Sequence, residues 1–264
     1  MIITMMTRKK WLIAAFGAIS LIIIIFTYRQ CSRSNRQPGT AVEPVYREQR
    51  LAMAQRAEKQ FNLTDSRVIE AVSAVPRHLF VAENLRHLAY SDTALPIGYG
   101  QTISAPYIVA WMTEELELEP GQRILEIGTG SGYQAAVLAE LGFTEVYSVE
   151  IVPELASRSA ALLDSLGYDQ LHLTQGDGYF GWQEHAPFDA IVVTAAPDHL
   201  PSPLVQQLAE GGRMLIPIGP PGGYQSMWKF VKVGGELTAY NLGGVIFVPL
   251  VSHQEPLPLE FTTP

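Results

Sequence analysis

The ten residues from Arg123 to Gly132, which read RILEIGTGSG, constrain the fold of this chain more than any other stretch. A short apolar run, Arg123–Ile127, is followed by three alternating glycines and then by small apolar residues with helical spacing. A strand, a glycine turn and a helix in this order form the first half of a βαβ unit. Open α/β sheets bind ligands at this end of their strands, and the helix N-terminus offers free N–H groups. We therefore expect an α/β fold that holds a ligand at this turn.

The spacing of the glycines indicates the kind of ligand. A dinucleotide-binding turn needs a small residue where this chain has Tyr133, because the helix and the strand pack closely there. The G-x-G-x-G spacing of Gly128, Gly130 and Gly132, with Glu126 two residues before it, instead resembles the nucleoside-binding loop of Rossmann-like S-adenosylmethionine methyltransferases. A glycine turn that binds no ligand remains the alternative at this point.

Composition and charge exclude several other classes of protein. A chain of 264 residues, with 47% apolar and 17% charged residues, is long enough for one sizeable globular domain or two small ones. The single cysteine, Cys31, excludes a disulfide framework and a cysteine-rich metal site, and the six histidines lack the spacing of a zinc site. Six of the 18 basic residues and none of the 26 acidic ones lie in residues 1–36, so the other 228 residues carry a net charge of −14. Such an acidic body argues against a nucleic-acid partner.

The N-terminus carries a separate apolar segment. Residues 11–28 form an uncharged, mostly apolar run of eighteen residues, preceded by three basic residues, which is about the minimum length for a membrane-spanning helix. No small residues follow it at the place where a signal peptide would be cleaved. We predict a membrane anchor in residues 1–36, with a cleaved signal segment as the alternative. Basic residues flank the run on both sides and leave its orientation open.

Three segments carry a resemblance to one enzyme family. They read VPRHLFV from Val75, LPIGYGQTISAPY from Leu95 and LEIGTGSGYQAAVLAEL from Leu125, and together they resemble protein-L-isoaspartate O-methyltransferases. The similarity continues through VYSVEI, GDGYFGW, FDAIVVTAAP, GGRMLIPIG and VIFVPL, and it covers roughly Tyr46 to Leu250. It implies transfer of a methyl group from S-adenosylmethionine to the free α-carboxyl of isoaspartyl residues in damaged proteins and peptides.

The predicted architecture is a mostly parallel sheet with an antiparallel C-terminal edge and helices on both faces. We expect a linker at residues 37–44 and one methyltransferase domain at residues 45–264. Its N-terminal helices and substrate loop occupy residues 45–118, and its Rossmann-like core occupies residues 119–264. Leu95–Pro106 is expected to be a loop, because glycines and prolines bracket its hydroxyl pair. The other predicted helices are Val45–Gln60, Ser66–Val75, Pro153–Leu166 and Pro203–Leu208, and the other strands are Glu145–Glu150, Leu171–Gln175, Phe188–Thr194, Arg213–Ile218, Gln225–Val233 and Leu237–Phe247.

The expected cofactor site draws on three strand ends. Glu150 ends the second strand and could accept hydrogen bonds from both ribose hydroxyls, or it could be an exposed strand-end carboxylate. Asp177, followed by Gly178, could meet the adenine amine, or it could be an ordinary turn aspartate. The complete set of predicted cofactor-binding residues is Thr102, Ile103, Glu126, Gly128, Gly130, Gly132, Glu150, Asp177 and Gly178.

The QTISAP segment supplies the predicted catalytic residue. By the resemblance, the hydroxyl of Ser104 orients the substrate carboxylate, and Thr102 and Ile103 lie between that carboxylate and the cofactor. The alternative is that Ser104 only caps the helix that begins after it. Val248–Leu250 is expected to help line the peptide cleft.

The implied chemistry demands little of the protein. An α-carboxyl has a reference pKa of about 3.5, so it is already an anion at neutral pH and needs no general base. The alternatives are a methyltransferase for a small or membrane-soluble acceptor, a nicotinamide oxidoreductase, and a peptide-binding module without catalysis. Because S-adenosylmethionine is made in the cytosol, we expect the catalytic domain to face the cytoplasm, with a periplasmic or exported domain as the alternative.

Overall fold

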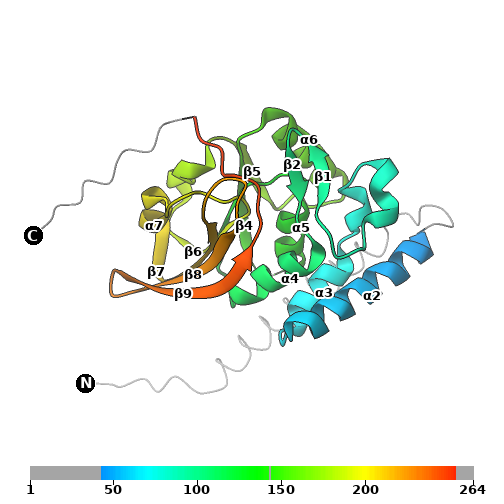
Figure 1. Cartoon of the computed structure of the whole chain (residues 1–264), viewed down its shortest axis with the longest axis horizontal. Helices are drawn as coiled ribbons and strands as arrows, with labels where there is room; N and C mark the ends of the chain where they lie inside the picture. The colour runs from blue at the N-terminus through cyan, green and yellow to red at the C-terminus, as the bar shows by residue number, and fades with distance from the viewer. Residues whose placement is uncertain (1–42, 143, 254–264) are drawn as a thin grey trace, which may run out of the picture. The chain divides into compact units, whose positions relative to one another are not determined.

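The structure is a computed structural model that describes residues 43–142 and 144–253 (Figure 1). The chain divides into two units, residues 1–45 and residues 46–264, and the description below concerns the second. The predicted anchor in residues 1–36 and most of the predicted linker lie outside the described residues. Helix α2 begins at Glu43, so it includes the last two residues of that linker. Among the described residues, no helix combines the length and the apolar character needed to cross a bilayer.

A seven-stranded sheet forms the centre of this unit, in the order β5-β4-β3-β6-β7-β8-β9. The five strands from β5 to β7 run parallel, whereas β8 and β9 add an antiparallel edge, as the sequence predicted. The bounds of the strands are β3 Arg123–Ile127, β4 Glu145–Glu150, β5 His172–Gln175, β6 Phe188–Val193, β7 Leu208–Ile218, β8 Gln225–Val233 and β9 Glu236–Val245.

Helices cover both faces of the sheet because the central strands are apolar on both faces. One face presents Ile124 and Val192 to α4 and α5, and the other presents Leu125 and Ile191 to α7. A parallel strand that is buried on both sides reads as a continuous apolar run, as β6 does. The helices are α2 Glu43–Phe61, α3 Ser66–Ala74, α4 Pro106–Glu115, α5 Tyr133–Glu140, α6 Pro153–Ser165 and α7 Ser202–Gln207.

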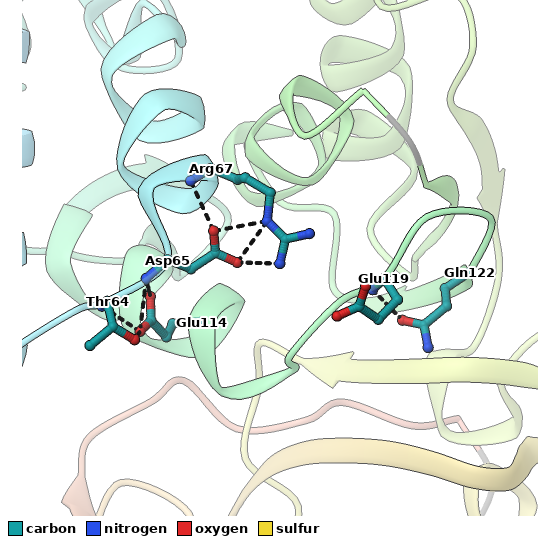
Figure 2. Close-up of polar contacts among 6 residues, drawn as sticks. All are labelled: Thr64, Asp65, Arg67, Glu114, Glu119 and Gln122. Atoms are coloured by element: carbon teal, nitrogen blue, oxygen red, sulfur yellow. Dashed lines mark hydrogen bonds and ion pairs between the residues drawn. The ribbon is translucent and has the colours of Figure 1, made fainter. Parts of the chain in front are cut away.

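The segment between α2 and α3 is held against α4 by the polar contacts shown in Figure 2. The carboxylate of Glu114, near the end of α4, accepts hydrogen bonds from the backbone N–H groups of Thr64 (2.6 Å) and Asp65 (3.1 Å). Asp65 in turn caps α3, since its side chain accepts from the backbone N–H of Arg67 at 2.9 Å. These bonds connect the start of α3 to the helix that follows the predicted catalytic segment.

Two predictions about local structure were wrong. Leu95–Pro106 was predicted as a loop, yet it contains an antiparallel pair, β1 Leu95–Gly98 and β2 Gln101–Ile103. The three residues at its turn, from Gly98 to Gly100, all have positive φ, so the glycines mark a tight turn between strands. Strand β7 also begins at Leu208, before the predicted Arg213, because its pairing with β6 accommodates a bulge.

Candidate active site

The glycine turn lies at the carboxyl end of β3, and its glycines have different roles. Gly128 has φ +96°, and a Cβ atom there would lie 2.5 Å from the Oγ1 of Thr194. Gly132 has φ +87°, and its Cβ would lie 2.9 Å from Leu163 on α6. Gly128 and Gly130 line small cavities at this turn, whereas Gly132 allows α5 and α6 to pack closely. Gly128 and Gly130 therefore border the predicted cofactor site, whereas Gly132 contributes through the packing of the helices next to it.

Glu150 stands at the end of β4, beside the same turn. One carboxylate oxygen accepts a hydrogen bond from the backbone N–H of Gly130 at 2.7 Å, and the other accepts from Val152 at 2.9 Å. The residue is only 5% exposed, which contradicts the alternative of an exposed strand-end carboxylate. Each oxygen keeps a second lone pair that can accept a bond from a ligand hydroxyl.

Glu126 lies beneath the turn and is fully buried. The pKa of its carboxyl is raised to about 8, chiefly by burial; the hydrogen bond from the Ser148 hydroxyl opposes this rise and the negative charge of Glu150 adds to it. A carboxyl with this pKa is mostly protonated at neutral pH. It borders a cavity of about 30 Å³ under Gly128 and Gly130, so its contact with a ligand is limited to that narrow space.

Asp177 and Gly178 follow β5 at the same edge of the sheet. Gly178 has no room for a side chain, because a Cβ atom would lie 2.5 Å from Ile127. Asp177 accepts from the backbone N–H of Tyr179 at 3.0 Å, which is the turn role considered above. Its other oxygen accepts from the Ser252 hydroxyl at 2.7 Å and from the His253 N–H at 3.0 Å. The carboxylate that was predicted to meet adenine is thus engaged by the C-terminal segment.

A cavity of about 620 Å³ opens beside the turn, within the size range of ligand sites. Ser104 lines it, and the Ser104 hydroxyl has no hydrogen-bond partner among the described residues. Helix α4 has Ala105 as its N-cap and no side-chain capping bond, which excludes the capping alternative for Ser104. Thr102 borders this cavity and also the narrow one of about 50 Å³ at Glu150. The Ile103 side chain is packed into the core, and Ile103 borders the narrow cavity of about 30 Å³ at the turn.

The lining of the large cavity is nearly neutral. Its described lining contains no histidine, lysine or arginine, and its only carboxylate, Asp92, lies 3.7 Å from the Nε of Arg56. The donors available to a charged substrate are therefore neutral ones: hydroxyls, backbone N–H groups, the Gln60 amide and the Trp111 indole N–H.

Thr194 is a site residue that the sequence interpretation did not single out. Its hydroxyl lies 2.9 Å from the Ile127 carbonyl and 2.7 Å from the Gly128 carbonyl, to which it can donate. It borders the large cavity and both narrow ones. A polar residue that ends an apolar strand at the ligand edge was the signal that could have found it. In the predicted cleft segment Val248–Leu250, Val248 borders the large cavity, and all three residues border the narrow cavity of about 50 Å³.

Comparison with known proteins decides the family. The sequence model of the protein-L-isoaspartate(D-aspartate) O-methyltransferase family matches residues 47–255. The chain belongs to this family. Its resemblance to protein-L-isoaspartate O-methyltransferases is thereby confirmed, as are the predicted fold class and S-adenosylmethionine as the cofactor.

Individual members of the protein-L-isoaspartate O-methyltransferase family are similar over most of their length. The chain is 47% identical over 233 residues to protein-L-isoaspartate O-methyltransferase 2 of Shewanella sediminis, which covers 88% of this chain and 94% of that protein. It is 54% identical over 183 residues to the Gloeobacter violaceus enzyme, which covers 69% and 89%. A solved structure from Plasmodium falciparum, in complex with S-adenosyl-L-homocysteine, is 28% identical with a TM-score of 0.68 and covers 76% and 98%.

Proposed function

We propose that this chain transfers a methyl group from S-adenosylmethionine to the α-carboxylate of L-isoaspartyl residues in damaged proteins and peptides. The observation that carries the proposal is the free hydroxyl of Ser104 in the large cavity beside the glycine turn. Family membership and the S-adenosyl-L-homocysteine bound to the Plasmodium relative support the enzyme class. The product is a repair intermediate, because the next backbone amide can attack the ester, expel methanol and close a succinimide. Hydrolysis of the succinimide returns part of the pool to the normal aspartyl linkage.

The cavity suits an acceptor that needs orientation and no activation. An α-carboxyl with a pKa of about 3.5 arrives ionised at neutral pH. Ser104 and Thr102 are neutral donors, so they can hold this carboxylate without pairing it to a cation that would weaken it as a nucleophile. Correct alignment of the reacting groups can lower a barrier by roughly 7–11 kcal/mol. We assign this positioning to Ser104, with Thr102 bordering both cavities between the carboxylate and the cofactor.

The residues at the turn fit S-adenosylmethionine, since Gly128, Gly178 and Glu150 border one narrow cavity at the carboxyl ends of the strands, where backbone and carboxylate can both reach a ligand. When bound, the cofactor supplies a methyl group on a positively charged sulfur. Glu150 would accept hydrogen bonds from the ribose hydroxyls through its remaining lone pairs. Asp177 would meet the adenine amine after Ser252 and His253 release its outer oxygen.

The test of this proposal compares three acceptors with isotopically labelled S-adenosylmethionine. They are an isoaspartyl peptide, the same peptide with a normal aspartyl linkage, and an extract of membrane lipids. We expect incorporation into the first peptide alone, in a form that base releases as methanol. If the label enters the lipid extract and not the isoaspartyl peptide, the result would favour the alternative, a methyltransferase for a membrane-soluble acceptor.

We further propose that residues 11–28 tether the enzyme to a membrane, with the catalytic domain facing the cytoplasm. The support is the eighteen-residue uncharged run with basic flanks, which precedes the part of the chain that the family model matches. The full chain should remain in the membrane fraction after extraction at alkaline pH, and a chain that begins at residue 43 should be released. Fused to the C-terminus, a reporter that works only in the cytoplasm should be active, and one that works only after export should be inactive. The opposite result would place the catalytic domain on the other side of the membrane.

A further inference from the structure

Three aromatic rings form one wall of the large cavity. Phe61 is the last residue of α2, and it stacks on Tyr107 with a centroid distance of 5.1 Å and an interplanar angle of 11°. It also stacks on Trp111, at 5.6 Å and 25°. Tyr107 and Trp111 are four residues apart on α4, so they project from the same side of that helix. All three rings border the cavity and are only partly buried.

The methyl transfer itself does not account for these rings. Orientation of the carboxylate requires the hydroxyl of Ser104, which comes three residues before Tyr107 in the chain. Partly exposed aromatic surface in a cavity favours contact with an apolar ligand group. The facing lining adds more apolar surface, including Leu242 and the 71% exposed Ile246. The single carboxylate of the lining, Asp92, lies within 3.7 Å of Arg56, so little unpaired charge remains to attract a basic side chain.

We infer that Phe61, Tyr107 and Trp111 form a subsite for an aromatic or large aliphatic side chain next to the isoaspartyl residue of the substrate. The inference rests on the proposed function and narrows its substrate class. The enzyme still accepts any polypeptide through the damaged residue, and this subsite ranks such polypeptides by the side chain beside the lesion. A contact of this kind acts on substrate binding, so its effect falls mainly on KM.

The experiment uses the full chain and isoaspartyl peptides that differ at one position on either side of the lesion, where they carry alanine, lysine or phenylalanine. Phenylalanine on one of the two sides should raise kcat/KM by roughly 3- to 10-fold over alanine, the range of one added aromatic contact. Phe61→Ala and Trp111→Ala should bring this ratio toward one. Tyr240→Ala is the matched control, because Tyr240 is 50% exposed and lies outside the cavity lining, and it should leave the ratio unchanged.

Equal kcat/KM for alanine and phenylalanine peptides in the unaltered protein would overturn the subsite, whether or not the variants fold. A preference for lysine would also overturn it and would assign selectivity to Asp92. If Phe61→Ala and Trp111→Ala keep the unfolding midpoint of the unaltered protein and still prefer the phenylalanine peptide over the alanine peptide to the same degree, the contact lies elsewhere and the inference is wrong. Failure to methylate even the alanine peptide would instead refute the proposed function.

Discussion

Replacement of Gly128 by alanine perturbs the cofactor site at the place where the structure leaves least room. The new methyl group would lie 2.5 Å from the Thr194 hydroxyl oxygen, so the hydroxyl must leave its position near the Ile127 and Gly128 carbonyls. The loss of its hydrogen bond costs roughly 0.5–1.5 kcal/mol. The φ of +96° adds about 1–2 kcal/mol for an L-residue. We therefore expect Gly128→Ala to lower the free energy of unfolding by about 1.5–3.5 kcal/mol.

Gly211 provides the matched control for this substitution. It has φ +75°, but a Cβ atom there would meet nothing within 4 Å, so Gly211→Ala carries the backbone strain alone, about 1–2 kcal/mol. Urea denaturation gives the two free energies of unfolding, and calorimetry gives the dissociation constant of S-adenosyl-L-homocysteine. We expect the dissociation constant to rise at least about 10-fold in Gly128→Ala, the effect of roughly 1.4 kcal/mol, and to stay unchanged in Gly211→Ala.

A double-mutant cycle isolates the contact between the new methyl group and Thr194. Thr194→Ala removes the oxygen that lies 2.5 Å away and leaves the Thr194 Cβ at 3.8 Å, which is an ordinary contact distance. Gly128→Ala should therefore cost less in the Thr194→Ala background, with a coupling of about 1 kcal/mol. Equal costs for Gly128→Ala and Gly211→Ala, together with an additive cycle, would show that the contact with the Thr194 hydroxyl does not contribute.

Three other substitutions test separate parts of the site. Glu150→Ala should weaken binding of S-adenosyl-L-homocysteine by about 1.5–3 kcal/mol through lost charged hydrogen bonds, and an unaltered dissociation constant in calorimetry would place the ribose elsewhere. The pKa of Glu126 is about 8 in the folded protein and 4.5 in the unfolded chain, so the folded protein binds this proton more tightly. The resulting stabilisation of the fold is fully present below pH 4.5 and is lost as the pH rises through 8. Between these pH values the free energy of unfolding should fall more steeply in the unaltered protein than in Glu126→Gln, by up to about 1.4 kcal/mol per pH unit. If urea denaturation gives the same pH dependence for both proteins, this expectation is contradicted. Arg77→Lys should lower the unfolding midpoint and raise KM for the peptide. The reason is that the buried guanidinium donates hydrogen bonds to the carbonyls of Ala89 and Thr93, and Thr93 borders the cavity. Unchanged values of both the midpoint and KM would contradict this role.

Local patterns were sufficient to predict the sheet and the adjacent strand ends at the glycine turn. The apolar run before Gly128 and the acid that ends β4 predicted two adjacent strand ends, and β3 and β4 indeed pair in parallel. A parallel strand end followed by glycine has few other structural uses, which is why this part of the prediction succeeded. The hairpin at Leu95–Ile103 was missed because prolines and glycines suggest a loop, although buried residues alternate along β1.

Features that depend on distant parts of the chain, or on backbone conformation, could not be predicted. The bonds from Ser252 and His253 to Asp177 join residues about 75 positions apart. The stack of Phe61 on Trp111 requires α2 and α4 to meet, which neither helix reveals alone. The absence of a capping role for Ser104 depends on the backbone conformation of Ala105, which residue type does not specify.

The most direct test of the account is the rate of methyl transfer to an isoaspartyl peptide by Ser104→Ala. The control is Ser165→Ala, which removes a serine hydroxyl from the exposed surface of α6. We expect kcat/KM to fall by roughly 10- to 1,000-fold in Ser104→Ala, as when one oriented donor is lost, with the dissociation constant of S-adenosyl-L-homocysteine unchanged. Equal turnover by Ser104→Ala and Ser165→Ala would contradict the claim that this hydroxyl positions the carboxylate.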